Sequence, residues 1–150
     1  MLDFYSDPKK GITGQLANMT MCSIDSMPAG GNIKAGAVLK LNTDNKTVVA
    51  LDKAADIAKG MGIALFSQKE VDANGYSYVD GDVVPVLTYG DVFMNVQAAA
   101  VKGYTCTVAD GTDTVLLTPV VAGTASEYTK IKCDETAGNG DVVMMHVDFK

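Results

Sequence analysis

The sequence lacks arginine and tryptophan, and it contains a single histidine, His146. Its twelve basic residues are all lysine and stand against eighteen acidic residues, which leaves a net charge of −6. Nucleic-acid binding depends on clustered positive charge, usually including arginine, that neutralises phosphates. A chain of this charge would repel a phosphate backbone, and it is equally unsuited to an anionic membrane surface. We therefore expect no nucleic-acid partner and no membrane partner.

Targeting signals and paired cysteines are also missing. The N-terminus has no basic stretch followed by an apolar one, and no apolar run approaches the roughly 18 residues that span a bilayer. Cys22, Cys106 and Cys133 are odd in number and belong to no CxxC pair, so the sequence predicts neither a disulfide framework nor a zinc site. We expect synthesis and folding in a reducing cytoplasm, with Cys106 and Cys133 buried as small apolar residues.

The motifs of hydrolytic and phosphate chemistry are absent as well. No GxSxG elbow and no Gly-Lys-Ser/Thr sequence occurs, and residues 60–62 lack the third glycine of a dinucleotide fingerprint. Only His146 could activate a nucleophile, with Asp148 on the same strand face and with Cys133 or a distant serine as the nucleophile. The simpler interpretation is a solvated residue on an outer strand. We predict no catalytic residue.

Paired carboxylates occur in three places: Asp80 with Asp82, Asp110 with Asp113, and Asp134 with Glu135. In turns that contain glycine, an aspartate stabilises the turn by accepting hydrogen bonds from nearby amides. A glycosidase needs two carboxyl groups in a cleft that binds sugar, and the spacing of an EF-hand calcium loop is also missing. We predict no metal site and no bound cofactor.

The first 34 residues differ in character from the rest. Residues 1–34 contain Pro8, Pro28 and the pair Gly30-Gly31, with scattered apolar residues and no sustained period. This composition favours an extended N-terminal arm or long loop, and residues 35–150 are predicted to form a single β domain. Such an arm either wraps its own domain or reaches onto a neighbouring molecule, and we favour the second because long loops without structure are uncommon in compact domains.

From residue 35 onward, short runs of alternating apolar and polar residues are separated by turn residues. Residues 35–42 and 47–52 are predicted to form a hairpin around the polar turn 42–46. Further strands are expected over residues 61–68, 76–78, 83–89, 92–96, 104–108, 114–121, 128–133 and 141–149. One short helix is expected over residues 53–59. This spacing indicates an all-β fold, either a β-sandwich or a small, jelly-roll-like β-barrel.

Gly-Asp-Val occurs three times, at Gly81, Gly90 and Gly140, and each copy is interpreted as a turn in front of a strand. The turn at Gly90-Asp91 would separate residues 83–89 from residues 92–96. Pro85 has no amide proton for a ladder, so its strand is predicted to lie at a sheet edge or to carry a bulge.

Residues 35–42 (AGAVLKLN) are followed by 47–52 (TVVALD), a short Ala-rich stretch and 61–66 (MGIALF). This order resembles the opening of the capsid decoration, or cement, proteins of tailed bacteriophages. GDVVPVLTYGDVFMNV at 81–96 and YTCTVADGT at 104–112 are also similar to that family. The resemblance covers roughly residues 35–113 and rests on small residues and turns.

The resemblance implies a virion structural protein, not an enzyme, made in the host bacterial cytoplasm. Such a protein binds the outer surface of an icosahedral capsid and stabilises it by cross-linking neighbouring major capsid proteins. The expected partners are the major capsid protein and the chain itself, as a dimer or trimer. The arm would lie on the shell and the β domain would project from it.

Two other functions remain open. One is another structural assembly subunit, of a tail or filament, which predicts self-assembly into rings or filaments without a shell. The other is a small β-barrel domain that binds a ligand or catalyses a reaction in the barrel interior, which predicts a deep apolar pocket.

Overall fold

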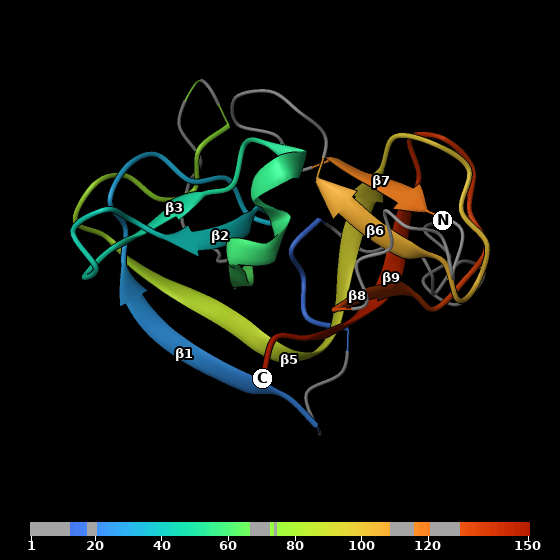
Figure 1. Ribbon diagram of the computed structural model, residues 1–150, viewed down its shortest axis with the longest axis horizontal. Coiled ribbons are helices and arrows are strands. Elements are labelled where there is room, and N and C mark those ends of the chain that lie inside the picture. The colour runs from blue at the N-terminus through green and yellow to red at the C-terminus, as the bar shows by residue number, and fades with distance from the viewer. Residues whose placement is uncertain (1–12, 18–20, 67–72, 74, 109–115, 121–129) are drawn as a thin grey trace, which may run out of the picture.

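A computed structural model of the chain describes residues 13–17, 21–66, 73, 75–108, 116–120 and 130–150 (Figure 1). Within these residues the chain forms nine β-strands and one short 3₁₀ helix, which agrees with the all-β prediction. The elements in chain order are β1 Ser23–Pro28, β2 Val38–Leu41, β3 Val48–Ala50, η1 Ala54–Lys59, β4 Gly60–Ala64, β5 Val83–Val96, β6 Thr105–Val108, β7 Leu116–Val120, β8 Ile131–Cys133 and β9 Val142–Asp148.

Strand β5 organises the molecule because two β-structures share it (Figure 1). Its first half pairs with β1 on one side and β4 on the other, and β2 and β3 extend this open sheet in the order β3-β2-β4-β5. Its second half pairs with β9 and, in parallel, with β7. The pairs β7–β6, β6–β8 and β8–β9 then lead back to β5 and close a barrel, as the barrel alternative predicted.

A register shift lets β5 serve both structures. Ser23 lies opposite Tyr89, and Ile24 lies opposite Leu87, so Thr88 is an extra residue in β5. One extra residue moves every following side chain to the other face of a strand. Even-numbered residues of β5 therefore enter one core before the shift and a different core after it.

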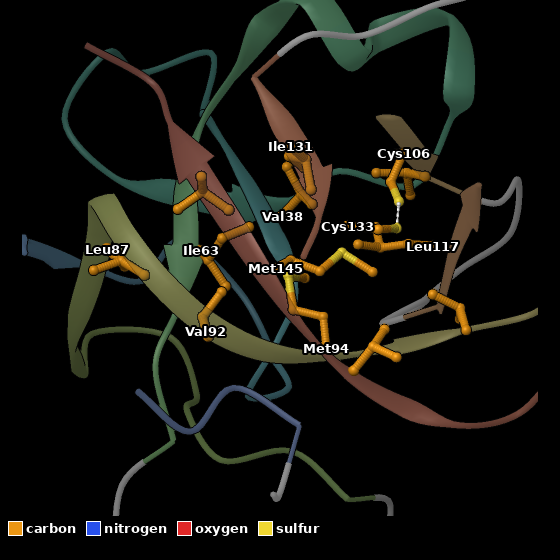
Figure 2. Close-up of a cluster of buried hydrophobic side chains, with 14 of the residues drawn as sticks. Val38, Ile63, Leu87, Val92, Met94, Cys106, Leu117, Ile131, Cys133 and Met145 are labelled. Carbon is orange, nitrogen blue, oxygen red and sulfur yellow. Dashed lines mark hydrogen bonds between the residues drawn. The ribbon is translucent and has the colours of Figure 1, made fainter. Parts of the chain in front are cut away.

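The buried side chains form two clusters. The first fills the barrel and reaches under β2 and β4 (Figure 2), and its largest members are Leu51, Ile63, Leu87, Met94, Leu117, Ile131 and Met145. The second lies against the open sheet and consists of Ala29, Ile33, Ala37, Leu39, Val48, Ala64, Tyr78, Val84 and Val86. The neighbouring residues Val38 and Leu39 belong to different clusters, so β2 is buried on both faces.

Several local predictions are confirmed, with changes in length. Strands β2 and β3 form the predicted hairpin, in whose turn the Asp44 carboxylate accepts hydrogen bonds from the amides of Lys46 and Thr47 at 2.8 and 2.9 Å. The predicted helix is η1, a 3₁₀ helix, and Gly60 begins β4 directly after it. The strand expected over 76–78 is only an isolated bridge between Tyr78 and Ile33.

The turn predicted at Gly90-Asp91 is wrong, because β5 runs straight through it. Gly90 has a φ of +140°, and a Cβ built on it would lie 3.0 Å from the Cβ of Cys22. Glycine is needed here because another segment approaches closely, whereas Gly81 and Gly140 do lie in turns. The strand of Pro85 is also not at a sheet edge, since Ser26 lies opposite it and its carbonyl accepts from the Leu65 amide. The other alternative predicted for this strand, a β-bulge, is confirmed, and the bulge lies at Thr88.

The described part of the arm packs on its own domain, so it is not the unpacked loop that its composition suggested. The amides of Gly14 and Ala17 donate to the carbonyls of Phe93 and Asp91, and β1 continues along the same side of β5. Ile33 is fully buried. Residues 1–12 and 18–20 lie outside the described residues, as do Asp110, Asp113 and parts of the strands expected over 61–68, 114–121 and 128–133.

Candidate functional site

His146 lies on the outer face of the barrel, where Asp91 of β5 holds it. Its Nδ1 is 2.8 Å from Asp91 Oδ1, and its ring meets the Tyr89 ring edge-on with centroids 5.1 Å apart. The sequence suggested Asp148 as the partner, but the Asp148 carboxylate accepts from the Lys150 amide. The imidazole is thus oriented by a neighbouring strand, which sequence spacing within β9 could not reveal.

The proposed nucleophile Cys133 is not within reach of this histidine. In the β8–β9 ladder Cys133 lies opposite Met145, and both are buried. His146 lies opposite Lys132, and Lys132 is exposed. Because successive side chains point to opposite faces of a sheet, the Cys133 thiol points inward and the imidazole outward. The two groups do not form a nucleophile–base pair.

Two of the carboxylates that the sequence singled out hold backbone amides in place. Asp82 accepts from the Val79 amide at 2.9 Å, and Glu135 accepts from the Met144 amide at 2.8 Å. Burial, and next the charge of Asp91, raises the pKa of the Asp134 carboxyl. Among the described residues, no three His, Cys, Asp or Glu side chains are grouped to hold a metal ion. No helix in that part of the chain is long and apolar enough to span a membrane.

The interior of the barrel is occupied by its own side chains. Figure 2 shows Met94, Leu117, Cys133 and Met145 pointing toward one another from four different strands. All four are 1% exposed or less. A ligand in the interior, as the ligand-binding alternative requires, would need the space that these side chains fill. A binding surface is therefore expected on the outside of the molecule.

A row of residues that is apolar except for Ser26 runs along β1 and the start of β5. Ser26 lies opposite Pro85 and Pro28 opposite Val83, so these residues share one face with Ile24. Ile24 is 45% and Val83 65% exposed, Pro28 is exposed and Pro85 is half-buried. We call Ile24, Ser26, Pro28, Val83 and Pro85 the β1 face. Single exposed apolar residues are ordinary, but here a strand ladder fixes four apolar residues on one face.

The outer edge of β1 adds a second feature to this surface. Within the described ranges β1 forms a ladder with β5 alone, and β1 runs along the outer rim of the molecule (Figure 1). An unpaired strand edge presents amide and carbonyl groups that can pair with another chain. The β1 face and this edge together make a surface suited to binding another protein.

Comparison with known proteins gave a family match and matches among solved structures. A family model described as "Structural cement protein (E217 gp24/Pam3 gp6)" matches residues 3–147. No curated protein sequence matches the chain. A chain of the solved structure "The capsid of Myoviridae Phage XM1" is similar in fold, with a TM-score of 0.66 at 16% sequence identity. The alignment covers 98% of this chain and 97% of that chain.

Proposed function

This chain belongs to the structural cement protein family, and from that premise we propose that it binds the outer surface of an icosahedral phage capsid and cross-links neighbouring major capsid proteins. Family membership makes the role structural and associates the chain with the capsid of a virion. The outer location, the cross-linking and the absence of an enzymatic activity are the proposed parts.

The charge of the chain supports a place on the outside of the shell. With a net charge of −6 and no arginine, the protein would be repelled by densely packed DNA. On the exterior the same charge carries no such penalty, and it keeps the free protein soluble before it binds.

The β1 face is the observation that carries the proposed contact. Burying exposed apolar surface is favourable by about 25 cal/mol per Å². Ile24 and Val83 are large exposed apolar members of the row, and both lie on strands whose positions the β1–β5 ladder fixes. Because the surface is already ordered, binding would lose little conformational entropy.

The division into an arm (residues 1–34) and a β domain (residues 35–150) gives the cross-link a geometry. Strand β1 belongs to the arm and β5 to the β domain, so a capsid bound at the β1 face would contact both parts of the chain. A dimer or trimer would hold two or three such faces, and binding several capsid subunits at once makes modest contacts effective through avidity. We propose this homo-oligomer as the cross-linking unit.

The test measures how much protein binds to capsids that lack it. Capsids are mixed with the full chain, sedimented, and analysed by quantitative mass spectrometry against the major capsid protein. The wild-type chain is expected to bind at a copy number comparable to that of the capsid subunit. The double variant Ile24→Asp/Val83→Asp is expected to bind at least about tenfold less, since charge on a buried contact costs more than 1.4 kcal/mol.

The matched control is Val101→Asp. Val101 is 47% exposed, an exposed fraction close to the 45% of Ile24, but it lies in the connection between β5 and β6. It is expected to bind like the wild-type chain. Equal binding by the double variant would overturn the assignment of the β1 face. Failure of the folded wild-type chain to bind capsids would overturn the proposed function, and rings or filaments formed without a shell would favour the assembly-subunit alternative.

A further inference from the structure

Cys106 and Cys133 are 27 residues apart in the sequence and adjacent in the fold. Their strands β6 and β8 pair through Thr105 and Lys132, which places the two cysteines diagonally across the ladder on its inward face. The two Sγ atoms are 3.3 Å apart (Figure 2). A disulfide bond is about 2.05 Å long, so the sulfur atoms need to approach by only about 1.3 Å.

The surroundings favour reaction between these two sulfur atoms over reaction with anything larger. Cys106 is 0% and Cys133 1% exposed, and the side chains around them in the barrel are apolar. Bulky oxidants and the thiols of other proteins are therefore excluded. A small oxidant can reach the two cysteines when the barrel opens transiently. The third cysteine, Cys22, lies beside Gly90 of β5 and is only partly buried.

The two thiols differ in acidity because they are hydrogen-bonded to each other. The hydrogen bond from Cys106 lowers the pKa of the Cys133 thiol. The same hydrogen bond, together with burial, raises the pKa of the Cys106 thiol. Cys133 is thus the sulfur that ionises first, and the thiolate is the form that attacks an oxidant.

We propose that Cys106 and Cys133 are an oxidation site, which hydrogen peroxide converts into a disulfide bond between β6 and β8. The Cys133 thiolate attacks one peroxide oxygen, the O–O bond breaks, and a sulfenic acid and hydroxide form. The Cys106 sulfur then attacks the Cys133 sulfur, the S–S bond forms and the S–O bond breaks. The leaving hydroxide takes the Cys106 proton, and the hydroxide from the first step takes the proton that Cys133 lost on ionising. Two thiols and one peroxide thus become one disulfide and two waters.

The bond would fasten the barrel after the chain has left a reducing cytoplasm. It would tie together two strands joined by a long connection, and such a cross-link lowers the conformational entropy of the unfolded chain. A cross-link of this loop length is expected to raise Tm by roughly 10 °C. Oxidation of this cysteine pair does not require capsid binding.

The test uses the reduced full chain and the variant Cys22→Ser, with and without hydrogen peroxide. The protein is unfolded, its free thiols are alkylated, and its intact mass and disulfide-linked peptides are measured. Before oxidation the wild-type chain is expected to take up three alkyl groups, and afterwards only one, on Cys22. Cys22→Ser is expected to fall from two alkyl groups to none, with the same linked peptide and the same rise in Tm.

Three results would overturn the proposal. Alkylation of all three cysteines after oxidation would show that the pair does not react. A linkage that contains Cys22, or that joins two chains, would show that a different pair reacts. An oxidised chain whose Tm equals that of the reduced chain would show that the bond does not fasten the barrel. Each measurement uses natural Cys106 and Cys133, so it does not require a core variant to fold.

Discussion

Gly62 lies where two neighbouring strands of the open sheet leave no room for a side chain. It lies in β4, and a Cβ built on it would be 2.3 Å from Val86 Cγ1 and 2.9 Å from the carbonyl oxygen of Leu87. The second atom belongs to the backbone of β5 and cannot rotate away. The packing of β4 on β5 therefore requires glycine at this position, whatever its backbone conformation.

We expect Gly62→Ala to lower the free energy of unfolding by about 1–3 kcal/mol, because the added methyl group must push β4 from β5. Urea unfolding followed by circular dichroism measures the change. The matched control is Gly31→Ala, since a Cβ at Gly31 has no atom within 4 Å. The control is expected to stay within about 0.5 kcal/mol of wild type. Equal effects of the two variants would contradict this account of β4.

Two aspartates are expected to respond to pH with opposite sign. Burial raises the pKa of Asp134, so this carboxyl favours folding at acid pH and loses that contribution as the pH rises through its raised pKa. The amides of Lys46 and Thr47 lower the pKa of Asp44. Asp44 therefore favours folding above its ordinary pKa of 3.8, and this contribution is lost as the pH falls through the lowered value.

We accordingly expect Asp134→Asn to raise the urea midpoint at neutral pH, because a neutral amide avoids the cost of a half-buried charge. Well below pH 3.8 the two proteins should become equal, since the wild-type carboxyl is then protonated. Asp44→Asn should lower the midpoint at neutral pH. The prediction for Asp134 fails if Asp134→Asn is the less stable protein at neutral pH.

At the scale of elements, the sequence could predict those strands that bury one face and expose the other, because their apolar and polar residues alternate. In β9, Val143, Met145 and Val147 alternate with more exposed residues and line the barrel, as the pattern indicates. Strand β1 could not be found this way, because its exposure does not alternate and its ladder to β5 holds it in place. The glycine at position 90 looks locally like a turn, and only the approach of Cys22 explains it.

The candidate surface could not be predicted from the sequence for a related reason. The β1 face joins residues about 60 positions apart, and it exists only because the ladder sets Pro28 opposite Val83. The sulfur pair depends in the same way on the pairing of β6 with β8. Spacing along one strand was available from the sequence, whereas register between distant strands was not.

Two of the isoleucines in the arm, one buried and one exposed, distinguish a residue needed for folding from a residue available for binding. Ile33 is fully buried, so Ile33→Ala is expected to lower the free energy of unfolding by about 2–5 kcal/mol. Ile24 is 45% exposed, so Ile24→Ala is expected to change it by less than about 0.5 kcal/mol. Urea titration of both variants tests whether this part of the chain is packed. Two small, similar effects would show that the arm is not part of the folded domain.

At the scale of the whole molecule, the open sheet and the barrel cannot unfold separately while β5 belongs to both. Val84 and Val86 of β5 pack in one cluster, and Val92 and Met94 of the same strand pack in the other. Losing either cluster would leave half of β5 without its core. The molecule should therefore behave as one cooperative unit in spite of its two β-structures.

Differential scanning calorimetry checks this cooperativity. Val86→Ala removes side-chain volume from the open-sheet core, and Met94→Ala removes it from the barrel core. Each variant is expected to move a single transition to lower temperature, with the calorimetric and van't Hoff enthalpies remaining equal. Two separate transitions in either variant would show that the two halves unfold independently.

The placement of β1 and β9 also determines how the molecule carries mechanical load. Both strands run antiparallel to β5, β1 along its first half and β9 along its second, and they meet at Tyr89 with Ser23 on one side and Asp148 on the other. Ladder hydrogen bonds lie perpendicular to the strands, so a pull that draws β1 and β9 apart along β5 strains all the bonds of each ladder together. Such shear resists far more force than peeling, which breaks bonds one at a time. Tension applied between β1 and the barrel would thus be distributed along the length of β5.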